Sequence, residues 1–159
     1  MKKFLALLLM AVMTVTCLAG CGDPVYDDLE NYLNVEAVNV NINYKALTEE
    51  LSKWETFETD AELATSLNDV LIPLVDASLT ELNGINPETA EVKELKAKYV
   101  MVFESYKKGF EALSEGCVTQ DEATINAGYE SLGEGVELLD EYNAGLEALA
   151  SEYGSEIEY

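Results

Sequence analysis

The chain contains no histidine and no arginine, so its nine positively charged residues are all lysines. Without histidine it cannot build imidazole-ligated zinc or haem sites, the Glu-x-x-His pairs of di-iron bundles, or a histidine-based catalytic triad. The nine lysines face 31 acidic residues, which gives a net charge of −22. Nucleic-acid binding depends on positive side chains that neutralise phosphates. We therefore expect no nucleic acid among the partners.

Cysteines and long apolar runs are also scarce. Two of the three cysteines, Cys17 and Cys21, lie close to the start of the chain, which leaves Cys117 as a lone thiol in the rest. A lone thiol cannot form an internal disulfide, and no histidine is present to activate it. Beyond residue 21 no stretch reaches the roughly 20 apolar residues of a transmembrane helix. We expect Cys117 to be a small buried group and the chain to have no second span.

The N-terminus has the pattern of a secretory signal. Lys2 and Lys3 precede an apolar stretch over residues 4–15, and Leu18-Ala19-Gly20-Cys21 follows. These last four residues resemble the lipobox of bacterial lipoproteins. The resemblance implies that residues 1–20 are removed and that Cys21 receives a diacylglyceryl group, whose acyl chains, such as palmitate, anchor the protein. The alternatives are an ordinary signal peptide with an incidental Cys21, or an uncleaved N-terminal helix.

Processing would make the remaining chain more acidic. Loss of Lys2 and Lys3 leaves seven lysines against 31 acidic residues, so the mature chain carries a net charge of −24. Such a charge supports solubility through repulsion, and it also suits an acidic surface that docks a cationic partner. Residues 21–25 would form the lipidated N-terminus and a short linker.

Apolar residues from Leu29 onward recur at steps of three and four, the period of one helix face. They predict a first helix over about residues 26–57, with Pro24 near its first turn. Within it, residues 38–44 alternate apolar residues with asparagines and end at Tyr44. This alternation has the period of a strand, and these residue types are weak helix formers. A helix is still expected, because no second strand-like segment is present to pair with it. The apolar face comprises Leu29, Leu33, Ala37, Val40, Tyr44, Leu47, Leu51 and Trp54.

A second helix is predicted to begin at the capping box Thr59-Asp60-Ala61-Glu62. Pro73 interrupts it, because the proline ring lacks an N–H and crowds the carbonyl of Asp69. We therefore expect a bend at residues 69–73. The apolar face comprises Leu63, Leu67, Val70, Leu74, Ser78 and Ile85, widened by Leu71, Val75 and Leu82.

Third and fourth helices follow. Pro87 is expected at the start of the third, and Gly116 at its end. A second capping box, Thr119-Gln120-Asp121-Glu122, predicts the start of the fourth, which runs to about Tyr153. Glycines inside this last helix favour close packing against a neighbour; they are Gly128, Gly133, Gly135 and Gly145.

Short connections between helices favour antiparallel neighbours. The sequence therefore predicts an all-α fold, an up-down-up-down four-helix bundle over residues 26–153, with a flexible tail over residues 154–159. A three-helix array with the asparagine-rich stretch unwound is the alternative.

Few residues suggest a site. Asn39 and Asn43 lie one turn apart, and with Pro73 and Tyr99 they form a possible ligand pocket between helices. Acidic pairs such as Glu49-Glu50 are adjacent in sequence, so they point in different directions on a helix and are expected on solvated faces. We predict no catalytic residues, no metal site and no cofactor.

These observations predict a lipid-anchored, non-enzymatic binding or protein-interaction module with an acidic surface, on the extracytoplasmic face of the cell membrane. The expected partners are the membrane, through the lipid on Cys21, and a cationic envelope or extracellular protein. The alternative is a lipoprotein that binds a small ligand or cation for a transport or sensing system.

Overall fold

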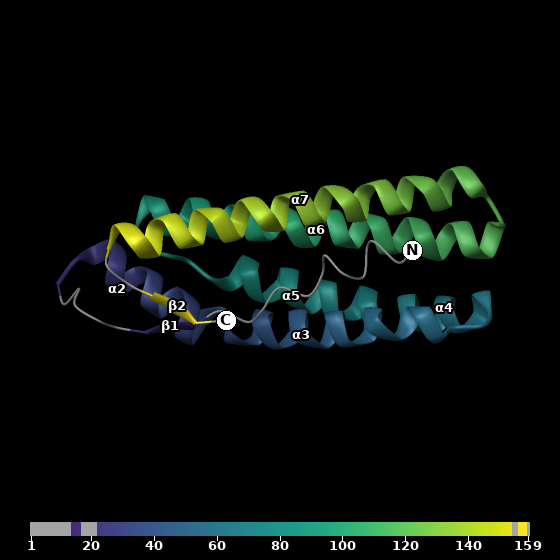
Figure 1. Ribbon diagram of the computed structural model, residues 1–159, viewed down its shortest axis with the longest axis horizontal. Coiled ribbons are helices and arrows are strands. Elements are labelled where there is room, and N and C mark those ends of the chain that lie inside the picture. The colour runs from purple at the N-terminus through teal and green to yellow at the C-terminus, as the bar shows by residue number, and fades with distance from the viewer. Residues whose placement is uncertain (1–13, 17–21, 154–155, 159) are drawn as a thin grey trace.

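The computed structural model describes residues 14–16, 22–153 and 156–158, so Cys21 and most of the predicted signal lie outside the described residues. The fold is all-α apart from one short strand pair. Two long helices, Ala90–Thr119 (α6) and Glu122–Glu152 (α7), lie side by side, and the earlier helices form the other side of an elongated molecule (Figure 1). None of the described helices is both long enough and apolar enough to span a bilayer.

The strand pair joins the two ends of the described chain. Thr14–Thr16 (β1) pairs antiparallel with Glu156–Glu158 (β2). The sequence predicts a flexible tail where β2 lies. Because β1 falls inside the predicted signal, cleavage would remove the partner of β2, and a flexible tail in the mature chain stays a prediction.

The first helical segment is interrupted, which corrects the single helix predicted over residues 26–57. It comprises Pro24–Asn31 (α2), a π-helical turn at Tyr32–Glu36 (η1), Val38–Ser52 (α3) and a 3₁₀ turn at Lys53–Thr56 (η2). Asp23 caps α2 through its side chain, with Pro24 in the first turn as expected. The asparagine-rich stretch is helical within α3, so the prediction of a helix there is confirmed.

The second segment also contains a π-helical turn. It comprises Asp60–Ser66 (α4), Leu67–Leu71 (η3) and Ile72–Gly84 (α5), and Thr59 with Glu62 forms the predicted capping box. The sequence predicts a bend at residues 69–73, and the π turn η3 ends within this range, two residues before Pro73. The buried side is formed by Leu67, Leu71, Val75, Ser78 and Leu82, whereas Val70 and Leu74 are half-buried at its edge.

Three predicted helix boundaries in the second half were wrong. Gly116 does not end α6, because it is buried inside the helix against Ile125, and the chain leaves the helix at Gln120, whose φ is +56°. The N-cap of α7 is Asp121 rather than Thr119. The third helix begins at Ala90 instead of Pro87.

The start of α6 is capped by a residue from a different helix. Asp28 of α2 is only 7% exposed, and its carboxylate accepts hydrogen bonds from the backbone N–H groups of Glu88 (3.0 Å) and Thr89 (2.7 Å) and from the Thr89 hydroxyl (2.5 Å). Burial alone would raise the pKa of Asp28, but these hydrogen bonds and nearby Lys93 outweigh it and hold the pKa below its ordinary value. One carboxylate thus joins the first helix to the third.

Glycines allow α6 and α7 to approach closely. A Cβ on Gly128 would lie 2.9 Å from the Gly109 carbonyl oxygen, and one on Gly135 would lie 2.5 Å from the Tyr106 ring. A Cβ on Gly145 would meet nothing closer than 3.6 Å. The close packing predicted for these glycines therefore holds at Gly128 and Gly135, but at Gly145 there is room for a side chain.

Candidate functional site

The four residues of the predicted pocket differ in burial, and the pocket itself stays a prediction. Asn39 and Pro73 are exposed, Asn43 is half-buried and Tyr99 is buried. The Tyr99 hydroxyl donates instead to Oδ1 of Asn41, at 3.4 Å. Residues two apart on a helix point about 200° away from each other, so Asn39 and Asn43 face away from the side on which Asn41 meets Tyr99.

The interior around Tyr99 is filled by aromatic rings. Tyr99 stacks on Tyr142, with ring centroids 4.3 Å apart and planes 11° apart, and meets Phe103 edge-on at 5.1 Å. Burial raises the pKa of each tyrosine in the core cluster, so these hydroxyls remain protonated. The tyrosines of the core cluster are Tyr32, Tyr44, Tyr99, Tyr106 and Tyr142.

Two of these hydroxyls lack a well-formed hydrogen bond among the described residues. The Tyr32 hydroxyl faces that of Tyr142, and the Tyr106 hydroxyl faces that of Tyr44, but neither Tyr32 nor Tyr106 reaches good hydrogen-bond geometry among the described residues. One carboxylate oxygen of Glu36, in the π turn η1, is also buried without a hydrogen-bond partner there. Buried polar atoms of this kind cost stability. The aromatic core is therefore not fully satisfied beside η1.

A solvent-open groove of about 380 Å³ lies where α3 gives way to α4. One end of α3 supplies Glu50, and the opposite wall comes from α4 and η3. Its lining is mostly apolar, with carboxylate and hydroxyl groups among the apolar side chains. The lining residues are Glu50, Phe57, Ala61, Glu62, Thr65, Ser66 and Val70.

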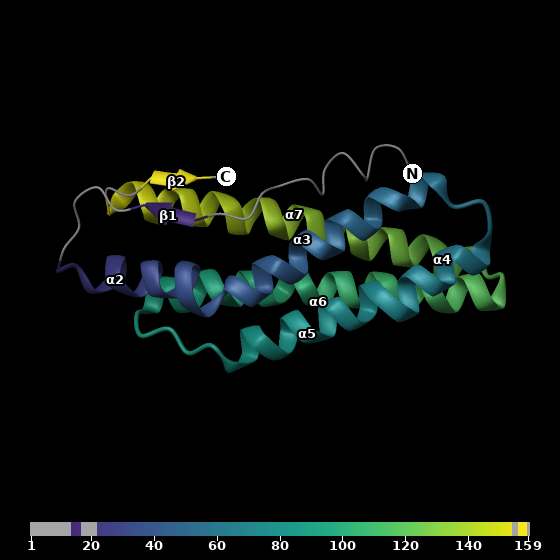
Figure 2. The same cartoon turned by 90° about the horizontal axis from the view of Figure 1, so that it is seen from below.

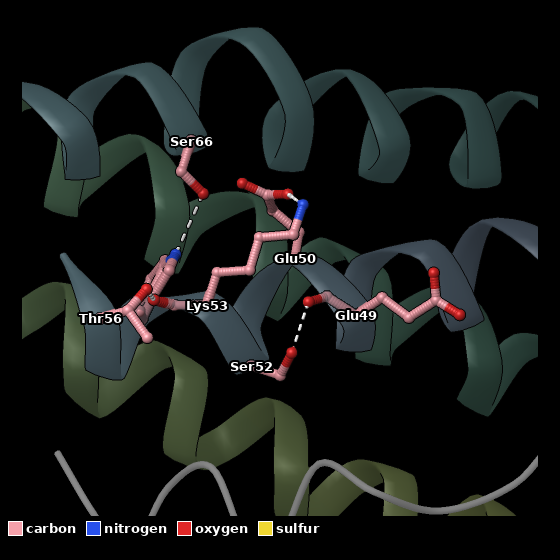
Figure 3. Close-up of polar contacts among 7 residues, drawn as sticks. Glu49, Glu50, Ser52, Lys53, Thr56 and Ser66 are labelled. Carbon is pink, nitrogen blue, oxygen red and sulfur yellow. Dashed lines mark hydrogen bonds and ion pairs between the residues drawn. The ribbon is translucent and has the colours of Figure 1, made fainter.

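The central charged group of this groove is Glu50, which is only 9% exposed. The Lys53 ammonium lies 2.5 Å from its Oε2 (Figure 3), and the two side chains are 59% and 11% exposed for lysine and glutamate respectively. Burial would raise the pKa of Glu50, but hydrogen bonds from Lys53 and Ser66 hold it below its ordinary value. Glu50 is therefore a buried carboxylate that stays charged.

The neighbouring Glu49 differs from Glu50 in exposure and in the direction of its side chain. It is exposed, and Figure 3 shows its carboxylate pointing away from Glu50 and Lys53. The expectation that both glutamates lie on a solvated face was wrong for Glu50. Glu50 comes three residues after the buried Leu47, and this spacing, rather than the acidic pair, was the signal that it faces inward.

Trp54 connects the groove to the body of the protein. Its indole N–H donates to Ser66 Oγ at 3.1 Å, and its ring meets Phe110 of α6 edge-on at 6.2 Å. It is the one tryptophan of the chain. Binding in the groove would therefore take place next to the indole ring of Trp54, which is a natural fluorophore.

Within the described part of the chain, no three Cys, Asp or Glu side chains are gathered so that they could hold a metal ion. Glu62, the other carboxylate of the groove, is engaged by the capping box: its Oε2 accepts from the N–H groups of Glu58 and Thr59, each at 2.9 Å. Glu50 thus remains the carboxylate of the groove that faces a cation. This arrangement suits the binding of one positive group.

Comparison with known proteins gives one match. A family model described as EMYY-motif containing lipoprotein matches residues 1–122, a range that includes the lipobox-like segment and extends to the first residue of α7. The tetrapeptide Glu-Met-Tyr-Tyr does not occur in this sequence. No curated protein and no solved structure matched.

Proposed function

Because this chain belongs to the EMYY-motif containing lipoprotein family and is a bacterial lipoprotein, we propose that it is a lipid-anchored, non-enzymatic binding module on the extracytoplasmic face of the membrane. The family implies membrane association through a lipid. Cys21 is our candidate for the lipid site, because it ends the lipobox-like segment inside the matched range. Two acyl chains suffice for stable anchoring, whereas one alone binds only marginally.

The partner that we propose is a cationic protein of the cell envelope. The observation that carries this proposal is the groove at Glu50, where a charged carboxylate is held nearly out of solvent in a chain with 31 acidic residues. A strongly negative surface attracts positive partners over a distance and speeds their encounter, and a buried charge then selects among them.

The scaffold for this groove, in our proposal, is an up-down-up-down four-helix bundle. Short connections at residues 57–59, 85–89 and 120–121 separate four helical segments, and the helix packing of Figures 1 and 2 fits this topology. The bundle would begin close to the membrane, since only Gly22 and Asp23 lie between Cys21 and Pro24.

The anchor is tested by exchanging one thiol at a time. We expect Cys21→Ser to release the protein from the membrane fraction, because no other residue would carry the lipid. Cys117→Ser, a matched change in α6, should leave the protein in that fraction. Retention of the Cys21→Ser protein would refute lipidation at this residue.

The partner is tested by crosslinking the native lipoprotein in its own membrane. A stoichiometric basic protein should be recovered with wild type and with Glu49→Gln, and lost with Glu50→Gln. Equal recovery with all three proteins would show that the partner binds somewhere other than the groove. Failure to recover a protein, together with thermal stabilisation by a small molecule, would favour the small-ligand alternative.

A further inference from the structure

We propose that the groove at Glu50 recognises a primary alkylammonium group, the end of a lysine side chain on the partner, and that Lys53 of this chain occupies its place in the unbound protein. This rests on the proposed function, because it names the chemical group through which a cationic partner would bind. Three features of the site support it: the carboxylate, its present counter-ion and the apolar walls.

The carboxylate requires a positive partner to stay charged where it is. Glu50 is nearly buried, and a buried charge is stable only when it is paired and hydrogen-bonded. Ser66 supplies a hydroxyl, and the structure places the Lys53 ammonium on Oε2. Whatever replaces Lys53 must therefore also be a cation.

Lys53 is suited to be replaced. Its side chain is mostly exposed while that of Glu50 is mostly buried, and Lys53 is absent from the lining of the groove. It reaches Glu50 from the surface, three residues along the same chain, so that its ammonium can return to water when another cation pairs with Glu50. A second ammonium approaching through the groove would compete for the same carboxylate oxygen.

The walls of the groove favour an ammonium on an aliphatic chain. Phe57, Ala61 and Val70 offer apolar surface on which methylene groups can pack, as lysine stems do elsewhere. The second carboxylate, Glu62, is already engaged by its capping box. The Lys53 ammonium contacts one oxygen of Glu50, Oε2, which suits a compact point charge, whereas a guanidinium is best matched when both oxygens of a carboxylate accept from it.

Trp54 provides the measurement, because its indole hydrogen-bonds Ser66 at the groove. We would titrate the detergent-solubilised lipoprotein with n-pentylammonium chloride and follow tryptophan fluorescence, with n-pentanol as the uncharged match. The ammonium should give a saturable change and the alcohol none. Equal responses to both compounds would overturn the proposal, because they would show that charge is not recognised.

Three variants separate the roles of the side chains. Glu50→Gln should weaken n-pentylammonium binding at least tenfold, whereas Glu49→Gln should change it less than twofold. Lys53→Ala should tighten binding severalfold, because the internal competitor is gone. A purely structural role for Lys53 would instead leave binding equal or weaker, and that result would overturn the assignment of Lys53 even if Glu50→Gln failed to fold.

A final comparison identifies the source of the ammonium. A capped Gly-Lys-Gly peptide should bind at least as well as 1,5-diaminopentane, and its acetyl-lysine form should not bind. Preference for the diamine by tenfold or more would overturn the assignment to a lysine side chain. If no amine bound while crosslinking still recovered a partner that depends on Glu50, this inference would fail and the proposed function would stand.

Discussion

The two sides of this molecule are both built from helices, but they differ in regularity. On one side, α6 and α7 run for 30 and 31 residues without interruption and meet through glycines. On the other side, π turns at η1 and η3 interrupt both helical segments, and a 3₁₀ turn ends the first. The comparison indicates that periodicity locates helices but does not show where a helix widens.

Buried residues in the interrupted segments include two successive steps of four, at Leu29-Leu33-Ala37 and at Leu67-Leu71-Val75. Two such steps cover eight residues, whereas two α turns take about 7.2. The same spacing joins Leu95, Tyr99 and Phe103 in α6, which stays α-helical throughout. The spacing of buried residues therefore allows a π turn but does not by itself place one.

The irregular side also carries the features with chemical interest. The groove is lined entirely by residues 50–70. Val35, Val38 and Ile42 are exposed apolar side chains at helical spacing on η1 and α3, and residues 37–44 include no charged residue. The irregular side packs against the uninterrupted helices. π turns in other proteins are likewise frequent at functional positions.

The largest expected effect breaks the regular side. Gly128→Ala should destabilise the protein by about 2 to 3 kcal/mol, because the new Cβ would meet the Gly109 carbonyl at 2.9 Å and the Leu113 backbone nitrogen at 3.0 Å. Backbone atoms cannot move aside as a flexible side chain can. Thermal or denaturant unfolding followed by circular dichroism measures the change.

Gly145→Ala is the matched control on the same helix. Its Cβ has ordinary contacts at 3.6 Å and beyond, so the better helix propensity of alanine should raise stability by about 0.5 to 1 kcal/mol. If Gly128→Ala and Gly145→Ala changed the free energy of unfolding in the same direction, the close approach at Gly128 would not be what stabilises the packing of α6 on α7.

A smaller effect is expected where the two sides are joined. Asp28→Asn should cost about 1.5 kcal/mol at neutral pH, because it removes a charged acceptor from the start of α6. Asp27→Asn, at an exposed position in the same turn, should change the free energy of unfolding by a few tenths of a kcal/mol. Urea unfolding of both variants compares them directly.

The Asp28 difference should also depend on pH. Its pKa is lower in the folded chain than its ordinary value of 3.8, so the unfolded chain binds the proton more tightly. The contribution is therefore present at neutral pH and is lost as the pH falls through about 4 and below. A gap between wild type and Asp28→Asn that stayed constant from pH 7 to pH 2.5 would contradict the assigned hydrogen bonds.

The smallest expected effect concerns the irregular side. Asn39→Ala should stabilise the protein by about 0.5 kcal/mol, since Asn39 is exposed inside α3 and asparagine is a weak helix former. Asn126→Ala, an exposed position in α7, should give a similar gain. A loss of stability at Asn39 alone would mean that this residue has a structural role that its exposure does not show.

Much of the architecture was predictable from the sequence. Periodicity and caps located all four helical segments, and η3 lies just before Pro73, where a bend was predicted. The turn η1 contains no proline, and the spacing Leu29-Leu33-Ala37 around it reads as ordinary helix spacing. The predicted end of α6 at Gly116 was wrong because Gly116 packs against Ile125 inside the helix. The predicted start of α7 at Thr119 was wrong because the side chain of Asp121 caps that helix.

The candidate site was less predictable. Asn39 and Asn43 were singled out for their spacing, but the asparagine that faces the core is Asn41, one turn after Ala37. Glu50 was hidden inside an acidic pair. The groove forms only when α4 folds back beside α3, and this packing depends on contacts distant in sequence, such as that between Trp54 and Ser66.

The link from Asp28 to Thr89 has a mechanical consequence. If the lipid is on Cys21, as we propose, any drag on the protein acts as tension at the start of α2. Because Asp28 bonds Glu88 and Thr89, which lead into α6, that tension passes to α6 and α7 as well as to α2. A force applied at the lipid would therefore be shared between α2 and the pair of α6 and α7 from the second turn of α2 onward.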